Sequence, residues 1–225
     1  MKNRVLILFG KKDVYMKKLE NLLKKKKIKL TTVYSSNKSK CKKIFNVKEN
    51  FYDFIFCFRS KYILKKSDIK KSKNPPINFH PGSPEYRGFG CFNYAIYDNS
   101  KNYGVTSHII TEKIDSGKII DVKRFKISSK DSLETLLKKT YKHLYFQAKK
   151  IIFILMADKN ILDELIKKNR NEKWSKKMKS KKDLNNFYEI DLSSNKIELQ
   201  RKIRATKFKN FKPFIIFHNR KFILD

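Results

Sequence analysis

The chain has 225 residues and a formal net charge of +34, with 40% hydrophobic and 13% aromatic side chains. These fractions exclude an intrinsically disordered protein, because disordered chains contain few aromatic and β-branched residues, and the length fits one medium domain, alone or with a small appendage. The charge would attract polyanions such as nucleic acid. The lysines are spread along the whole chain, which favours a bias in composition over a nucleic-acid-binding patch.

The cysteines Cys41, Cys57 and Cys91 show no C-x-x-C spacing, so we expect reduced thiols and no structural zinc. The first apolar run, Val5 to Phe9, is too short for a signal peptide. No run approaches the length of a membrane-spanning helix. We therefore expect a cytoplasmic protein without a membrane segment or a metal site.

The first half of the chain alternates predicted strands and helices. Apolar and β-branched runs predict strands over residues 4–10, 28–36, 52–60 and 77–80, and amphipathic spacing predicts helices over 13–27 and 39–45. This alternation predicts an α/β fold with a Rossmann-like, mostly parallel sheet and flanking helices. Ligands of such sheets bind beyond the carboxyl ends of the strands. Arg59 and His80 lie at two of those ends.

The second half follows a different pattern. Residues 103–111 and 118–127 are expected to form adjacent antiparallel strands. A long helix follows, with Asp131 as its N-cap and Glu134 in capping-box position. The polar stretch 167–186 is expected to be a linker or exposed loop. A helix over 197–205 and a hairpin turning at Asn219-Arg220 complete the chain. We thus expect a main domain over 1–166, the linker, and a small C-terminal subdomain over 187–225.

The stretch "INFHPG" is the strongest chemical signal. In a strand, Asn78 and His80 point to the same face, and Pro81 ends the strand, because proline cannot donate to a central sheet. An amide that stabilises an oxyanion beside an imidazole that moves a proton suits acyl transfer. Asp115, in the turn "KIDSGKII", is the candidate carboxylate to orient the ring. A purely structural strand-end histidine is the alternative.

The segments "INFHPGSPEYRG" and "YGVTSHIITEKIDSGKII" together resemble the folate-dependent formyltransferase family, and within it the sugar N-formyltransferases. The resemblance extends from the start of the chain to about Phe125. Ser116 and Lys118 depart from the threonine and proline that are common in the family. The matching positions have the family's order and spacing: Asn78, His80, Pro81, Arg87, Gly88, Gly104, Val105, Thr106, Asp115 and Gly117.

The resemblance implies 10-formyltetrahydrofolate as formyl donor and direct attack by an amine, without a metal. Asn78 would stabilise the tetrahedral oxyanion, His80 would assist proton transfer, and Asp115 would hold His80 and a water. The folate would bind along the loop after the third strand and the loop before Asp115. The residues implied there are Phe58, Arg59, Ser60, Tyr62, Ile63, Thr111, Glu112 and Ile114.

The same resemblance implies a dTDP-linked amino-dideoxyhexose as acceptor, a homodimer, and a role in surface polysaccharide (O-antigen) synthesis. The chain stops at Asp225, so we expect no further C-terminal barrel of the kind that grips tRNA. The C-terminal segment would complete the acceptor site. The residues implied in acceptor binding are Tyr86, Arg87, Gly90, Phe92, Asn93, Tyr94, Arg204, Lys207 and Phe208, with Phe211 as a second candidate for stacking on the base.

Three other functions stay open. A formyltransferase could act on another amine, such as that of methionyl-tRNA. Cys91 could be the nucleophile of a thiol acyltransferase, with His80 as base. A basic nucleic-acid-binding protein is the non-enzymatic alternative. The remaining histidines, His108, His143 and His218, show no metal-binding spacing and are expected to be structural.

Overall fold

A computed structural model describes residues 2–46, 51–209 and 211–224. Within them, six strands form a sheet in the order β2-β1-β3-β4-β5-β6. β1 to β4 are mutually parallel, whereas β5 is antiparallel to both of its neighbours, which confirms the predicted mostly parallel sheet with an antiparallel excursion. These strands are β1 Arg4–Phe9, β2 Lys29–Tyr34, β3 Phe54–Phe58, β4 Ile77–His80, β5 Asn102–Ile109 and β6 Ile119–Lys126.

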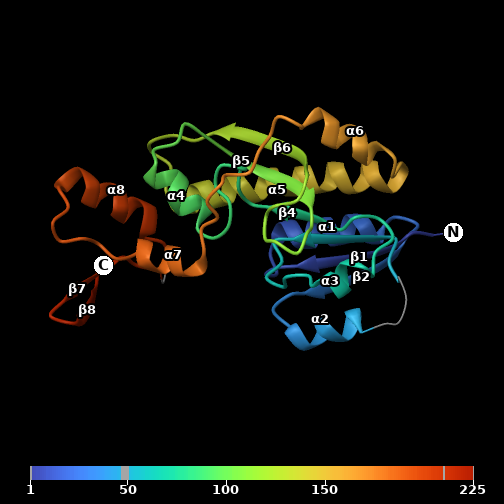
Figure 1. Cartoon of the computed structure of the whole chain (residues 1–225), viewed down its shortest axis with the longest axis horizontal. Helices are drawn as coiled ribbons and strands as arrows, with labels where there is room; N and C mark the ends of the chain where they lie inside the picture. The colour runs from blue at the N-terminus through green and yellow to red at the C-terminus, as the bar shows by residue number, and fades with distance from the viewer. Residues whose placement is uncertain (1, 47–50, 210, 225) are drawn as a thin grey trace.

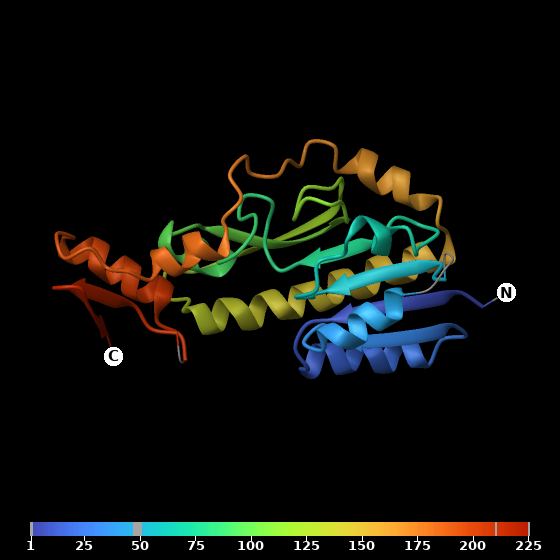
Figure 2. The same cartoon turned by 60° about the horizontal axis from the view of Figure 1, so that its bottom comes forward.

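Several helices pack against the two faces of this sheet, and the C-terminal elements gather at one end of the molecule, far from the N-terminus (Figures 1 and 2). A two-stranded antiparallel hairpin, β7 Phe214–Phe217 and β8 Arg220–Ile223, belongs to this end. The helices are α1 Val14–Lys24, α2 Lys38–Phe45, α3 Lys66–Ile69, α4 Cys91–Tyr97, α5 Leu133–Ala157, α6 Ile161–Lys168, α7 Lys181–Phe187 and α8 Lys196–Thr206.

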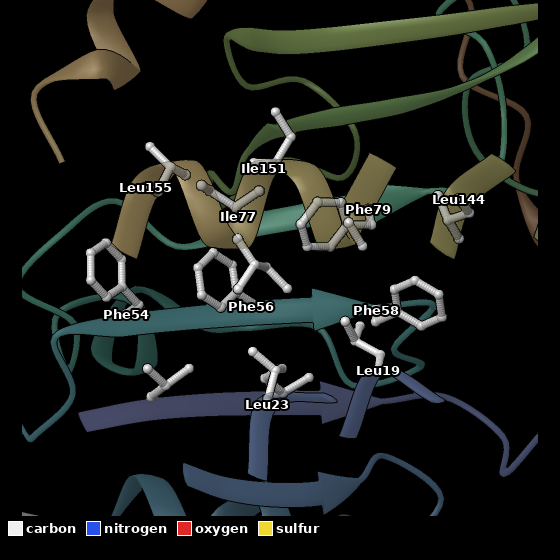
Figure 3. Close-up of a cluster of buried hydrophobic side chains, with 14 of the residues drawn as sticks. Leu19, Leu23, Phe54, Phe56, Phe58, Ile77, Phe79, Leu144, Ile151 and Leu155 are labelled. Atoms are coloured by element: carbon white, nitrogen blue, oxygen red, sulfur yellow. The ribbon is translucent and has the colours of Figure 1, made fainter. Parts of the chain in front are cut away.

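One face of the sheet carries the main hydrophobic core. Strand side chains alternate between faces, so Phe54, Phe56 and Phe58 of β3 all face α1 and α5, together with Phe79 of β4. Figure 3 shows these rings beside Leu144, Ile151 and Leu155 of α5. The core therefore contacts β4 only through the face of the sheet that is turned toward α1 and α5.

The opposite face is divided. Over β1 and β3, a second cluster that includes Ile55 and Cys57 packs against Cys41 and Phe45 of α2. Over β4 and β5, loops cover the sheet instead, and the residues on this face are polar: Asn78 stands directly opposite His108 in the β4–β5 register. The sheet therefore presents a polar half-face where a cavity can form.

Several local details differ from the sequence-based expectations. Ser132 caps α5, accepting a hydrogen bond from the Thr135 N–H, so the prediction of Asp131 as N-cap is wrong. Asp131 instead accepts hydrogen bonds from Lys139 and from the Ser128 N–H. The last residues of the expected linker are helical, because Ser180 and Asp183 form a capping box that starts α7. α3, α4 and α6 were not expected.

The hairpin turn also lies one residue earlier than expected. Its central residues are His218 and Asn219, whose φ angles are 45° and 59°. A two-residue hairpin turn of this kind needs positive φ at both positions, which asparagine tolerates better than most residues. The sequence pattern located the hairpin, and the φ requirement sets its turn.

Two further observations concern the cysteines and membrane-spanning helices. Cys41, Cys57 and Cys91 are all free and buried. Across residues 2–46, 51–209 and 211–224, no helix combines the length and the apolar character needed to cross a membrane.

Candidate active site

The site begins at the end of β4. Phe79 is fully buried in the core, so Asn78 and His80 both project from the polar face, as the alternation predicts. The chain after His80 is held by two hydrogen bonds: the Tyr103 hydroxyl donates to the Pro81 carbonyl (2.8 Å) and the Thr106 hydroxyl to the Gly82 carbonyl (2.8 Å). The imidazole therefore projects from a fixed backbone.

Asp115 reaches this face from the connection between β5 and β6. That connection starts opposite Ile77, the first residue of β4, and folds back over the sheet. Asp115 has a φ of 44°, a left-handed conformation that is uncommon for residues other than glycine. At Gly117 a Cβ atom would lie 1.8 Å from the Ile109 carbonyl oxygen, so only glycine fits. The site thus lies on the sheet face and not simply beyond the strand ends.

His80 is held between two hydrogen-bond acceptors. Its Nδ1 lies 3.4 Å from an Asp115 carboxylate oxygen, and its Nε2 lies 3.2 Å from the Tyr86 carbonyl oxygen. Both of these partners can only accept, which favours a ring that is protonated on both nitrogens. Burial would lower the pKa of His80, but the charge of Asp115, with a smaller contribution from Cys91, raises that pKa to about 9. His80 is therefore an imidazolium at neutral pH.

The Asp115 carboxylate is correspondingly stabilised as an anion. Burial would raise the pKa of Asp115, but the positive charge of His80, a contact with His108 and the N–H of Gly88 lower it to about 2. Arg87 fixes the turn beside it by donating to the Ile114 carbonyl oxygen (2.8 Å). The pair is thus charged on both sides near neutral pH.

His108 belongs to the same cluster, which the sequence reasoning missed. Its Nε2 lies 3.1 Å from the Asn78 amide nitrogen and 3.4 Å from the other Asp115 carboxylate oxygen. Its Nδ1 contacts the carbonyl of the next residue, Ile109. The only sequence signal was its alternation with Thr106 on one face of β5. That signal becomes informative once the β4–β5 register is known.

A cavity of about 440 Å³ opens above these side chains, which we call the triad cavity. This volume is within the range of small-molecule sites. Asn78, His80, His108 and Asp115 all line it. Its other walls come mostly from two loops, residues 59–64 and 110–115. These walls combine apolar side chains such as Ile63, Leu64 and Ile110 with polar ones such as Ser60 and Thr111.

Most residues expected to bind folate lie on these walls. The lining includes Arg59, Ser60, Tyr62, Ile63, Thr111 and Ile114. Two of the expected residues, Phe58 and Glu112, are not among the lining residues. Phe58 is fully buried in the core on the opposite face, and Glu112 is exposed and lies 3.7 Å from Lys66. The guanidinium of Arg59 pairs with Asp13 and packs on the Tyr141 ring, so it anchors the loop.

The residues expected at the acceptor site are divided between two other cavities. Gly90, Phe92, Asn93 and Phe208 line a cavity of about 1010 Å³ beside the C-terminal segment, which we call the C-terminal cavity. Tyr86, Arg87 and Tyr94 line a separate cavity of about 420 Å³. Arg204 donates to Asn99 (3.3 Å), and Lys207 is exposed at the end of α8. Phe211 also lines the C-terminal cavity.

Lys61 lines both the triad cavity and the C-terminal cavity, so the two adjoin. Asn93 connects α4 to the C-terminal segment, because its amide donates to the Ala205 carbonyl (2.7 Å).

Among the residues that the structure describes, no group of three His, Cys, Asp or Glu side chains could hold a metal ion.

The fold and site define a folate-type formyltransferase scaffold, and comparison with known proteins agrees. Residues 3–146 match the family model described as formyl transferase, and the chain belongs to that family. It is 34% identical over 146 residues to the bifunctional polymyxin resistance protein ArnA of Wigglesworthia glossinidia brevipalpis, covering 63% of this chain and 22% of that protein. It is 35% identical over 81 residues to a methionyl-tRNA formyltransferase of Listeria monocytogenes, covering 36% of this chain and 26% of that protein. The chain spans about a quarter or less of these relatives.

Solved structures are similar over nearly the whole chain. A 4-N formyltransferase from Francisella tularensis superposes with a TM-score of 0.69 at 21% identity, covering 99% of this chain and 96% of that one. An N-formyltransferase from Helicobacter canadensis, in complex with folinic acid and dTDP-3-aminofucose, gives a TM-score of 0.66 at 22% identity, covering 97% and 85%. These similarities establish the shared fold, including its C-terminal part.

The charge state of His80 can be measured directly. We expect NMR titration of the imidazole to give a pKa of about 9, and Asp115→Asn to move this pKa below 6.5, because burial then acts without the opposing carboxylate. A pKa near 9 in the Asp115→Asn variant would contradict this assignment.

The two pKa shifts also predict how the stability of the fold depends on pH. The raised pKa of His80 stabilises the fold below pH 6.5, and this contribution is lost as pH rises through about 9. The lowered pKa of Asp115 stabilises the fold above pH 3.8, and this contribution is lost as pH falls through about 2.

Proposed function

We propose that this protein is a sugar N-formyltransferase that transfers a formyl group from 10-formyltetrahydrofolate to the amine of a dTDP-linked amino-dideoxyhexose. The observation that carries the proposal is the contact of His80 with Asp115, beside Asn78, on the wall of the triad cavity. The sugar acceptor is supported by the similar structures, one of which was crystallised with a dTDP-amino sugar. A role in surface polysaccharide synthesis is part of the same proposal.

In the proposed reaction the amine nitrogen forms a bond to the formyl carbon, and the bond from that carbon to the folate nitrogen breaks. The amide of Asn78 and the charged ring of His80 stabilise the oxyanion that develops. One proton must move from the amine to the folate nitrogen. His80, protonated at the start, gives its proton to the leaving nitrogen and is protonated again by the amine, while Asp115 stabilises the imidazolium.

The folate occupies the triad cavity in this proposal, and the acceptor enters from the C-terminal cavity. Aromatic side chains of the C-terminal cavity, among them Phe208 and Phe211, suit stacking on a base. Lys61, where the two cavities adjoin, suits the diphosphate. Residues 1–166 then carry the formyl transfer, and 187–225 complete the acceptor site.

A homodimer stays a prediction. The hairpin offers a surface for it, because its apolar side chains Ile216, Phe217, Phe222 and Ile223 are exposed.

One observation favours a second candidate, a thiol acyltransferase. The Cys91 sulfur lies 3.8 Å from His80 Nε2, the arrangement of a thiol beside its base. However, Cys91 is buried and donates its S–H to the Gly88 carbonyl (3.1 Å). The direct transfer is therefore the better supported chemistry.

The function is tested with 10-formyltetrahydrofolate and a panel of nucleotide-linked amino sugars, with methionyl-tRNA as a further acceptor. We expect turnover with a dTDP-amino sugar. His80→Asn and Asp115→Asn should lower kcat roughly 100- to 10,000-fold, the contribution of a positioned acid–base group. Formylation of methionyl-tRNA and of no sugar would overturn the proposed acceptor.

Cys91→Ser separates the two chemistries. If the amine attacks the formyl carbon directly, the serine variant retains most of its activity, because oxygen replaces sulfur at nearly the same size. The measurement is kcat with the best acceptor of the panel. A loss as large as that of His80→Asn would instead identify Cys91 as the nucleophile.

Two truncations test which cavity holds which substrate. Phe208→Ala should raise KM for the acceptor about tenfold, the magnitude of a lost base-stacking contact, and leave KM for the folate unchanged. Ile63→Ala, in the triad cavity, should raise KM for the folate instead. Equal effects of each variant on both KM values would refute the assignment.

A further inference from the structure

One segment lies beside the site without lining the triad cavity or the C-terminal cavity. Residues 172–179, inside the stretch expected to be a linker, run alongside the loop that follows His80. The Ser175 N–H donates to the Pro84 carbonyl (2.9 Å), and the Phe89 N–H donates to the Lys179 carbonyl (2.8 Å). We call residues 172–179 the crossing segment.

Two further features fix the crossing segment in place. Arg124 of β6 binds Glu172 (2.8 Å) and Glu85 (2.6 Å) at once, which joins the segment to the loop after His80. At Gly88, whose φ is 91°, a Cβ atom would lie 2.3 Å from the Lys179 carbonyl oxygen. The loop and the segment therefore approach each other as closely as backbones can.

The crossing segment carries Trp174 onto the catalytic cluster. The indole ring lies edge-to-face against both imidazoles, with ring centroids 5.7 Å from His80 and 4.9 Å from His108. Its N–H donates to the Gly117 carbonyl (2.8 Å), in the turn that holds Asp115. Trp174 is not among the residues that line the triad cavity, so it contacts the two rings from outside that cavity.

We propose that Trp174 is a positioning residue of the active site, which holds the Asp115 turn against the two histidines and excludes water from their outer side. Without the indole, water would screen the attraction between Asp115 and His80, because Coulomb interactions weaken as the local dielectric rises. The kinetic part of this inference rests on the proposed function; its effect on the charge of His80 does not.

Besides the Tyr86 carbonyl, titratable groups surround His80 from several elements. Asp115 approaches from the β5–β6 turn, His108 from β5 and Cys91 from the first turn of α4. Lys181 of α7 lines the same cavity. The indole of Trp174 does not titrate, so Trp174 acts through burial and position.

The chain provides its own reporter, because Trp174 is its only tryptophan. An imidazolium quenches a nearby indole, whereas a neutral imidazole quenches it much less. We expect the tryptophan emission of the substrate-free protein to rise as pH passes through about 9, where His80 loses its proton. The step should vanish in His80→Asn. Emission that does not depend on pH, or a step that persists in His80→Asn, would overturn the inference.

The positioning role is tested with Trp174→Ala and Trp174→Phe. In the alanine variant, NMR should show the pKa of His80 falling from about 9 toward 6.5, and kcat should fall roughly ten- to hundredfold with little change in either KM, as expected for a misplaced catalytic group. Phenylalanine keeps a ring against the histidines and should retain most of both properties. An unchanged pKa of His80 in Trp174→Ala would refute the role.

Phe146→Ala is the matched control. This aromatic side chain is 53% exposed on α5, and its removal should change neither the pKa of His80 nor kcat. If the fluorescence and NMR results hold while no acceptor is formylated, the inference about Trp174 stands and the proposed function fails. If an acceptor is formylated while the pKa of His80 is unchanged in Trp174→Ala, the function stands and this inference fails.

Discussion

The site depends on keeping one buried carboxylate charged. Removing an ion from water costs several kcal/mol unless neighbouring groups compensate, and Asp115 is 8% exposed. Its compensation comes from three separate places in the chain: His80 at the end of β4, His108 in β5 and the backbone N–H of Gly88. None of these groups is local to Asp115, so the carboxylate can be ionised in this position only when the sheet and both loops are correctly assembled.

The two faces of the sheet differ in character: one is packed with the hydrophobic core, and the other carries the polar residues of the site. The face toward α1 and α5 is filled with apolar side chains, whereas the face over β4 and β5 is polar and is covered by loops. The reversal of β5 is what brings His108 opposite Asn78, since antiparallel pairing places side chains directly across from each other. A fully parallel sheet with a helical crossover at this point would have filled the space that the triad cavity occupies.

Much of this arrangement could be predicted from the sequence, and the reasons for the failures are physical. Apolar runs located the strands, and alternation placed Asn78 and His80 on one face. Asp115 was assigned from the family resemblance together with its place in a glycine turn. The contacts of His108 depend on strand register, and those of Trp174 on a segment almost 60 residues downstream of the Asp115 turn; neither has a local signature. The shift of the α5 cap from Asp131 to Ser132 reflects two neighbouring residues that can both accept hydrogen bonds.

β4 contributes side chains both to the triad cavity and to the hydrophobic core. Asn78 and His80 face the cavity while Phe79, between them, is fully buried on the other side. Because side chains alternate with a period of two, one inserted or deleted residue would exchange the layers and send the imidazole into the hydrocarbon interior. The loops around β4 can therefore change in length without disturbing this alternation, whereas the spacing of these three positions tolerates substitutions but no insertion or deletion.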